Sequence, residues 1–266
     1  MDNSIIPISN FQLAFSVLLI LITGGISSLL KLGLLKSLIW GTSRTFIQLT
    51  LVGYALTYIF QINNLWLIMA IITLMCYIAS RAAVKRTPNV PDYPAVLAFL
   101  SLLASTYLVG TIVTVLIIAP DPWYSARIVI PMLGMILGNS MNGIAISLDR
   151  LYGEARSRAA EIEAMLTFGA TPWEAVRSSV REAIRAGMTP TINSLMVVGL
   201  VSLPGMMTGQ ILGGADPREA VRYQIVVMLM IAAAVAIGCL ILVGLSYKKL
   251  FNDDGALQSF VLQSRK

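Results

Sequence analysis

Long apolar runs, separated by short polar segments, recur along the whole chain. A run of roughly 20 apolar residues matches the length of a helix that crosses the hydrocarbon core of a bilayer. We therefore predict an all-α, polytopic helical membrane protein, a single domain over residues 1–266 with about seven transmembrane helices. The predicted spans are residues 11–30, 45–61, 65–82, 95–119, 127–148, 190–212 and 224–246.

Lysine and arginine are distributed unevenly between the two sides of the predicted membrane. If the N-terminus lies outside, only Arg127, Arg218 and Arg222 of the nineteen basic residues lie outside with it. Because basic residues are enriched in cytoplasmic loops, this distribution predicts an N-out, C-in orientation. The first ten residues carry no lysine or arginine, so the first span is expected to be retained rather than cleaved as a signal peptide.

The segment from Leu30 to Arg44 allows two interpretations. Lys31, Lys36 and Arg44 punctuate an otherwise apolar stretch, which is typical of an amphipathic helix lying on the inner leaflet. The same residues are equally compatible with one longer second helix that extends into the cytosol.

Composition argues against enzymatic chemistry. The chain has 57% hydrophobic and 12% charged residues, against about 45–50% and about 25% in globular proteins. It has no histidine, which removes the usual general base and the commonest metal ligand. No Ser–His or HExxH arrangement is present either, so we predict that the chain is not an enzyme and assign no metal ligands.

Cysteine, methionine and net charge add little to this interpretation. Cys76 and Cys239 lie inside apolar spans and are expected to be packing residues. Thirteen methionines do not favour a copper site, because no closely spaced methionine array lies beside a cysteine or histidine. The net charge is +6, and the basic residues responsible for it lie beside the apolar spans. This placement argues for membrane topology rather than for a nucleic-acid partner.

A charged segment of about residues 149–189 connects the fifth and sixth spans. Its first half, roughly Glu154 to Phe168, is rich in good helix formers. Gly169 predicts the end of this helix, and Thr171-Pro172 with Glu174 predicts a capping box that begins a second one. We therefore predict two cytosolic helices joined by a sharp knee at residues 168–171. The alternative is a solvated loop that only connects two spans, although such connections are normally shorter.

The residues around this knee match a known motif. Glu163-Ala164 and Gly169 reproduce the first half of E-A-A-x-x-x-G, found in the cytosolic loop of ABC transporter permeases, with Met165 in place of the second alanine. The later I-x-L-P element is absent, since residues 179–182 read SVRE. Two longer stretches, GMILGNSMNGIAISLDRLYGEARSRAAEIEAMLTFGATPWEAVR and LPGMMTGQILGGADPREAVRYQ, resemble the FetB-type iron-export permeases, whose plant relatives are linked to aluminium tolerance.

This resemblance implies a permease subunit of an ABC transporter that exports iron, a related metal species or a chelate. The chain has no G-x-x-x-x-G-K-[ST] loop, so ATP and Mg²⁺ are expected on a separate ATPase subunit, and no cofactor is expected on this chain. Two copies are expected to pair around the path in a bacterial inner membrane. The residues expected to couple to the ATPase are Glu163, Ala164, Phe168, Gly169, Ala170, Thr171, Pro172 and Trp173.

The alternative is a secondary transporter or channel for a small solute. Such a protein would need a relay of ionisable residues within the membrane, which the centres of the predicted spans lack.

Polar residues at membrane depth mark a candidate substrate path. Asn139 and Asn142 share one face of the fifth span, and amides in hydrocarbon need partners. Pro204 predicts a break in the sixth span, and broken helices mark binding sites in many transporters. The alternatives are that the asparagines only join helices and that the break is an ordinary helix end. Met206, Met207 and Gln210, after the break, are further candidates. Arg44 and Gln48 on the second span are the last two, although the Arg44 side chain is also suited to snorkelling to lipid headgroups.

Overall fold

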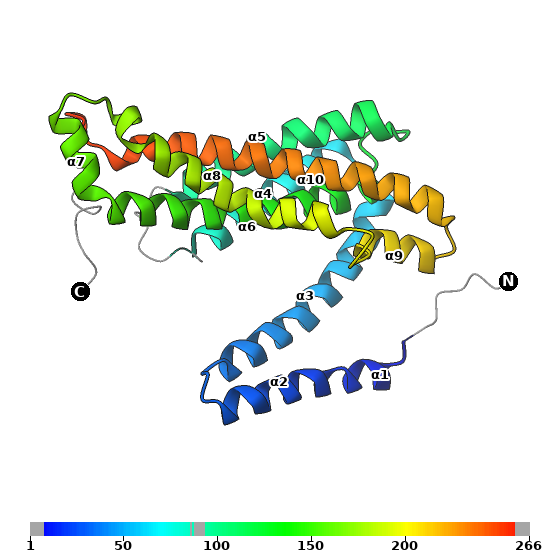
Figure 1. The fold of residues 1–266 in the computed structure, drawn as a ribbon. Coiled ribbons are helices and arrows are strands. Elements are labelled where there is room, and N and C mark those ends of the chain that lie inside the picture. Colours follow the sequence, from blue (N-terminus) through cyan, green and yellow to red (C-terminus); the bar gives the residue numbers. More distant parts are fainter. Residues whose placement is uncertain (1–7, 86, 88–93, 259–266) are drawn as a thin grey trace.

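The chain is a bundle of helices from which an N-terminal helical hairpin projects (Figure 1). The computed structural model describes residues 8–85, 87 and 94–258. Over these residues no strand forms beyond isolated bridges, which confirms the predicted all-helical class. The helices are α1 (Asn10–Phe15), α2 (Val17–Leu29), α3 (Leu35–Ile62), α4 (Leu65–Lys85), α5 (Pro94–Thr111, continued by a π-helical segment Ile112–Ile118), α6 (Ala126–Ser157), α7 (Ala159–Thr167), α8 (Pro172–Val197), α9 (Gly205–Leu212) and α10 (Pro217–Ser246, followed by a 3₁₀ turn Tyr247–Leu250).

Six described helical stretches are long and apolar enough to cross a membrane. They correspond to six of the predicted spans and are Asn10–Leu29, Leu35–Ile62, Leu65–Lys85, Pro94–Ile118, Ala126–Ser157 and Pro217–Leu250. The predicted span over residues 190–212 is not a single helix. Its first part belongs to α8, which runs without interruption from the knee through Pro190 to Val197, and its last part is α9.

The break between α8 and α9 covers residues 198–204. Gly199 adopts a left-handed conformation with φ of +82°, and Pro204 is the N-cap residue of α9. A proline at this position lacks the N–H that would continue a helix, so the chain restarts after it. The predicted irregularity at Pro204 is therefore confirmed, and it is a full interruption rather than a kink.

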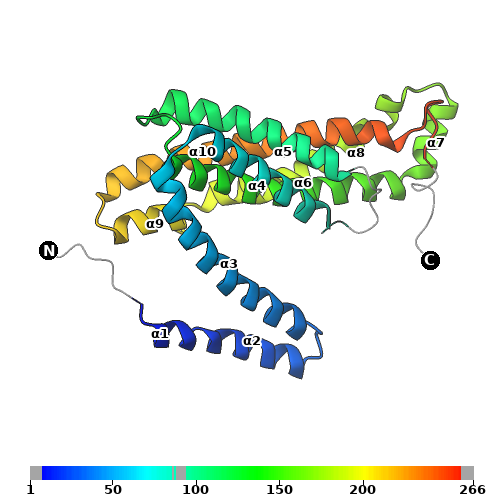
Figure 2. The same cartoon turned by 180° about the vertical axis from the view of Figure 1, so that it is seen from behind.

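The core of the bundle is centred on α6. This helix packs most extensively against α8 and α10 and also contacts α4 and α5, as the two opposite views show (Figures 1 and 2). Ile136, Ile144 and Leu148 of α6 are fully buried. Cys76 and Cys239 are free thiols buried in the same core, as predicted.

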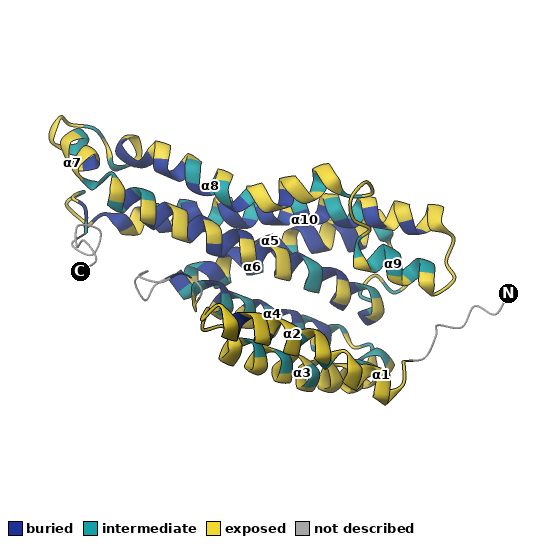
Figure 3. Cartoon of the chain, turned by 60° about the horizontal axis from the view of Figure 1, so that its bottom comes forward, coloured by how far each residue is buried: buried dark blue, intermediate teal, exposed yellow. Residues whose placement is uncertain are grey.

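The hairpin formed by α1, α2 and α3 stands away from this core. No residue of α3 is buried, and α2 buries only Gly24 and Ser27 (Figure 3). Of the two interpretations of residues 30–44, the structure supports the longer second helix, because α3 begins at Leu35.

The two ends of the bundle carry different elements. The α7 end holds α7, the knee at residues 168–171 and the C-terminal segment 251–258; the α9 end holds α9, the turn at Asn63 and the loop 119–125 (Figure 1). At the α9 end the side-chain Oδ1 of Asn63 accepts a hydrogen bond from the Ala126 backbone N–H at 2.9 Å, which ties two predicted outer loops together.

The predicted orientation can be tested with single cysteines. Ser157 at the α7 end and Ala215 at the α9 end are both exposed, so neither substitution disturbs packing. We expect a membrane-impermeant thiol reagent to label Ala215→Cys in intact cells and Ser157→Cys only after lysis. The reverse labelling would refute N-out, C-in. The predicted charge asymmetry also includes Arg86, Arg265 and Lys266, which lie outside the described residues. Ser264, a second position predicted to be accessible from the cytosol, lies outside them as well.

Candidate functional site

The knee begins with a hydrogen-bonded C-terminal cap of α7. The Gly169 N–H donates to the Leu166 carbonyl at 3.0 Å, and the Ala170 N–H donates to the Met165 carbonyl at 3.0 Å. This pair of bonds is the Schellman motif, which requires a left-handed residue after the helix. Gly169 supplies it with φ of +89°. The chain therefore reverses at the glycine that the sequence predicts.

The second helix begins with the predicted capping box. The Glu174 N–H donates to the Thr171 hydroxyl oxygen at 3.3 Å, and the Thr171 N–H donates to the Glu174 carboxylate at 2.8 Å. Pro172 occupies the first helical turn, where its missing N–H costs nothing. Hydrogen bonds from the Thr171 side chain and backbone hold the pKa of Glu174 below its usual value, so the charged form that makes the box is favoured at neutral pH.

A second set of contacts holds α7 against α8. Arg158, in the gap between α6 and α7, forms an ion pair with Glu161 and donates a hydrogen bond to the Ser178 hydroxyl on α8. The hydrogen bond from Arg158 lowers the pKa of Glu161, which keeps the pair ionised. These contacts fix the direction in which the knee projects.

The knee presents aromatic side chains to solvent. Phe168 is 90% exposed, an extreme value for phenylalanine, and lies at the tip. Trp173 is half-exposed and packs on Tyr247 with ring centroids 5.3 Å apart. An exposed aromatic residue on a rigid support is typical of a protein–protein contact.

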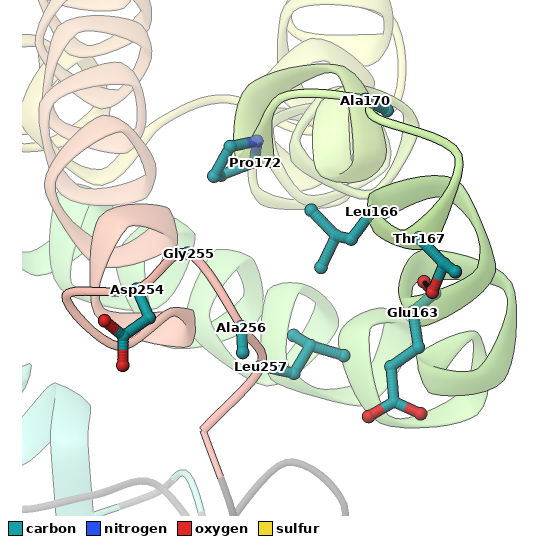
Figure 4. A pocket seen from close by; sticks show the side chains of 9 residues that line it. All are labelled: Glu163, Leu166, Thr167, Ala170, Pro172, Asp254, Gly255, Ala256 and Leu257. Carbon is teal, nitrogen blue, oxygen red and sulfur yellow. Dashed lines mark hydrogen bonds between the residues drawn. The ribbon is translucent and has the colours of Figure 1, made fainter.

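The C-terminal segment supports the knee, which the sequence did not indicate. Phe251 pairs with Leu257, and both side chains are buried. A hollow of about 540 Å³ lies between this segment and the knee. Figure 4 shows Glu163 and Leu166 on one side of it and Asp254 and Leu257 on the other. The remaining lining residues are Thr167, Ala170, Pro172, Gly255 and Ala256.

The predicted coupling residues are thus brought together at one end. Glu163 and Ala164 are exposed on α7, and the stretch from Phe168 to Trp173 forms the reversal beside them. All eight therefore lie at the α7 end, in α7, the knee and the first turn of α8.

A second candidate site lies near the α9 end, within the bundle. It is a cavity of about 300 Å³ between α6, α8, α9 and α10. Asn139 of α6 lines it together with Pro204 and Met206 at the break, so the structure joins these three predicted path residues. Met135, Thr191, Ser194, Val197, Val198, Ser202, Gly205, Gln224, Val227, Met228 and Ile231 complete the lining.

Gln224 is a buried polar cavity residue that the sequence interpretation missed. It is 5% exposed, and its Oε1 has no hydrogen-bond partner among the described residues. The last predicted span begins at Gln224, whereas α10 already begins at Pro217. The start of α10 has a recognisable local cap pattern. Asp216 accepts a hydrogen bond from the Arg218 N–H at 2.7 Å, and Pro217 is the first helical residue. This pattern places Gln224 two turns inside the helix.

The other predicted path residues lie elsewhere. Met207 lines an adjoining hollow of about 360 Å³ that shares Pro204 and Gln224 with the cavity. Gln210 lies one turn further along α9, with its Oε1 buried and unpartnered among the described residues. Asn142 lies one turn beyond Asn139 and does not line the cavity. Arg44 and Gln48 are exposed on α3, away from it.

The chemistry of the cavity is that of neutral donors and acceptors. Its lining offers amides, hydroxyls, thioethers and no charged group. Across the described part of the chain, no group of three or more histidine, cysteine, aspartate or glutamate residues is placed to hold a metal ion.

Long apolar helices and a helix interruption with an amide-lined cavity beside it define a multi-pass helical membrane protein. The chain belongs to the Uncharacterised protein family (UPF0014), whose model matches residues 10–251.

Three relatives illustrate the breadth of this family. The chain is 41% identical over 228 residues to a UPF0014 membrane protein of Synechocystis, covering 85% of this chain and 87% of the relative. It is 36% identical over 246 residues to the Probable iron export permease protein FetB of Escherichia coli, covering 92% and 93%. It is 35% identical over 235 residues to Protein ALUMINUM SENSITIVE 3 of Arabidopsis thaliana, covering 88% and 84%. No solved structure matches the chain.

The buried amide of Gln224 gives a test that separates transport from packing. An unpartnered buried carbonyl lowers stability, by roughly 1–3 kcal/mol, so Gln224→Leu should keep or raise the thermal unfolding temperature. If the amide contacts cargo, the same change should lower transport about tenfold, as expected for one lost hydrogen bond to a desolvated group. Gln61→Leu, at an exposed position on α3, is the control for both measurements. Lost stability with normal transport would show that Gln224 is only a packing residue.

Proposed function

We propose that the chain is the membrane-spanning permease subunit of an ABC transporter that exports iron, a related metal species or a chelate. Membership of the UPF0014 family, together with 36% identity to an Escherichia coli relative named a probable iron export permease, supports this cargo class. The neutral lining of the cavity favours a chelated or otherwise shielded species over a bare divalent cation, because hard cations are bound by carboxylates.

The observation that carries the ATPase part of the proposal is the knee. Phe168 projects from a reversal held by a Schellman motif on one side and a capping box on the other, and this reversal contains the glycine of the E-A-A-x-x-x-G half-motif. Such a rigid knob suits insertion into a groove on an ATP-hydrolysing subunit. ATP and Mg²⁺ then belong to that subunit, and two permease copies provide two knobs for a pair of ATPases.

The test is reconstitution with a candidate ATPase. The full chain, co-purified with an ATP-binding subunit, is placed in liposomes, and ATP hydrolysis and movement of iron, iron chelates and other metals are measured. We expect hydrolysis that depends on the permease and rises with the transported species. Uptake or release that proceeds equally without ATP would overturn the proposal in favour of a secondary transporter or channel.

A further inference from the structure

The helix α9 begins with backbone donors that no described residue satisfies. Its first three N–H groups, those of Gly205, Met206 and Met207, have no hydrogen-bond partner among the described residues. The N-cap residue is Pro204, whose side chain has no oxygen that could accept from them. Because unused N–H groups at a helix N-terminus carry a partial positive charge, this end of α9 attracts an anion or another electron-rich oxygen.

This N-terminus faces the cavity between α6, α8, α9 and α10. Pro204, Gly205 and Met206 line the cavity, and α9 runs from them away from the middle of the bundle (Figure 1). The 8 residues of α9 extend about 12 Å, so the free N–H groups lie that far from the loop at the α9 end. A backbone donor at this depth in a membrane protein needs a polar partner, because lipid offers none.

The cavity also holds a buried acceptor that lacks a donor. Gln224 lines the cavity and is 5% exposed, and its Oε1 has no hydrogen-bond partner among the described residues. Two side-chain donors of the lining are already used within their own helices. One N–H of Asn139 donates to the Met135 carbonyl at 2.9 Å. The Ser194 hydroxyl donates to the Pro190 carbonyl at 3.0 Å. A ligand in the cavity therefore meets free N–H donors from α9 and a free acceptor from α10.

The C-terminus of α8, which borders the same cavity, does not cancel the positive end of α9. The Val197 carbonyl at the end of α8 accepts hydrogen bonds from the N–H groups of Leu200 at 3.2 Å and Val201 at 3.0 Å. No charged side chain occurs in residues 186–215 or 224–246 that could outweigh these backbone dipoles. The uncapped N-terminus of α9 thus favours negative charge at the cavity.

We infer that the cavity binds a small ligand that combines one anionic oxygen group with hydroxyl groups, as a hydroxycarboxylate does. The oxyanion accepts hydrogen bonds from the free N–H groups of α9, and a hydroxyl donates to Oε1 of Gln224. A helix N-terminus is equivalent to about half a positive charge, which suits a single anionic group. The cavity volume of about 300 Å³ is at the lower end of the range for small-molecule sites and fits an organic acid.

The inference rests on the proposed transport function and narrows its cargo. Carboxylate and hydroxyl oxygens bind hard metal ions, so a hydroxycarboxylate carries such an ion as a chelate. The cavity then contacts the remaining oxygens of the chelating molecule and not the metal ion itself. This agrees with a lining that offers hydrogen-bonding groups and no charged side chain.

Binding of gluconate and of sorbitol to the purified full chain in nanodiscs tests this assignment. The two molecules share a hydroxyl-bearing skeleton, and sorbitol has a neutral alcohol where gluconate has its carboxylate. We expect gluconate to bind about tenfold more tightly, since charge-assisted hydrogen bonds are roughly twice as strong as neutral ones. Equal affinities, or no detectable binding of gluconate, overturn the inference.

This measurement needs no ATPase, so it fails or succeeds independently of the proposed function. ATP hydrolysis by the reconstituted complex is recorded in parallel. Permease-dependent hydrolysis without a preference for gluconate refutes the anion site alone. A preference for gluconate without permease-dependent hydrolysis refutes the proposed function and leaves the binding site in place.

Two substitutions of the N-cap residue isolate the charge. Pro204→Asn and Pro204→Asp each supply a side-chain oxygen that caps the free N–H groups, so both should keep α9 helical. Pro204→Asp also places a negative charge where the oxyanion would lie. We expect it to lower gluconate affinity at least about tenfold further than Pro204→Asn does, with sorbitol affinity equal in the two variants. Unchanged gluconate affinity in Pro204→Asp, or an equal loss in both variants, overturns the inference.

Gln224→Leu tests the hydroxyl contact without altering the helix break. It removes only the acceptor, so gluconate and sorbitol should both bind about tenfold more weakly and the preference for gluconate should remain. Gln61→Leu, exposed on α3, is the matched control and should change neither affinity. Gluconate affinity that is unchanged in Gln224→Leu would place the ligand outside the cavity and overturn the inference.

Discussion

Replacing Gly169 with leucine is expected to abolish transport-coupled ATP hydrolysis while the permease remains folded and inserted. Gly169 holds φ of +89°, a conformation that costs an L-residue roughly 1–2 kcal/mol, and no atom lies within 4 Å of the position that its Cβ would occupy. The variant therefore folds with modest strain. The reversal relaxes, however, and the new side chain projects beside Phe168 into the space that a partner would fill.

The measurement is ATPase activity of the reconstituted complex. Thermal unfolding of the variant checks that it remains folded. Gly153→Leu is the matched control, because Gly153 is also exposed near the α7 end, has no crowded Cβ position and lies within a regular helix. Glu163→Lys should lose coupling as well, since it reverses the charge of the half-motif on the same surface. Normal coupling in both Gly169→Leu and Glu163→Lys would remove the knee from the mechanism.

Gly187→Ala is expected to give the largest loss of stability among conservative changes in the bundle. Gly187 lies where α8 crosses α6, and an added Cβ would meet the Ser147 hydroxyl and lie 2.7 Å from the Gly143 carbonyl oxygen and 3.0 Å from the Cys239 sulfur. Because the carbonyl belongs to the backbone of α6, relief requires the two helices to separate. Overpacking of this kind typically costs about 1–3 kcal/mol, and the cost is greater when backbone must move.

Thermal unfolding in detergent checks this prediction. Gly244→Ala on α10 is the control, since nothing lies within 4 Å of its added Cβ and the change should be neutral or slightly stabilising. Ser147→Ala should restore only part of the stability lost in Gly187→Ala, because it removes the hydroxyl contact and leaves the Gly143 carbonyl in place. Equal unfolding temperatures for Gly187→Ala and Gly244→Ala would show that the crossing is looser than the structure indicates.

The sequence by itself determined the class of protein, most helix positions and the knee. These features depend on local information: apolar runs of bilayer length, a glycine that closes one helix at residue 169, and a threonine–proline–glutamate pattern that opens the next at Thr171. A capping residue and its partner lie within a few positions of each other, so their pattern can be recognised without knowledge of the rest of the fold. The same local logic, applied at Asp216-Pro217, would also have placed the start of α10 correctly.

Tertiary structure alone decided which polar residues meet. Asn139 and Gln224 are separated by more than eighty positions and lie in one cavity, while Gln48, equally polar and equally within a span, stands apart on α3. The sequence also gave no sign that the segment 251–257 packs beneath the knee, or that α8 continues into the bundle and ends at Val197. The physical reason is that the hydrophobic pattern of a helix indicates how much of its surface is removed from water. It does not indicate which neighbouring helix covers that surface. This ambiguity about the neighbour is greater in a membrane, because lipid covers an apolar face as readily as another helix does. Close contacts such as that of Gly143 with Gly187 then select the partner helix.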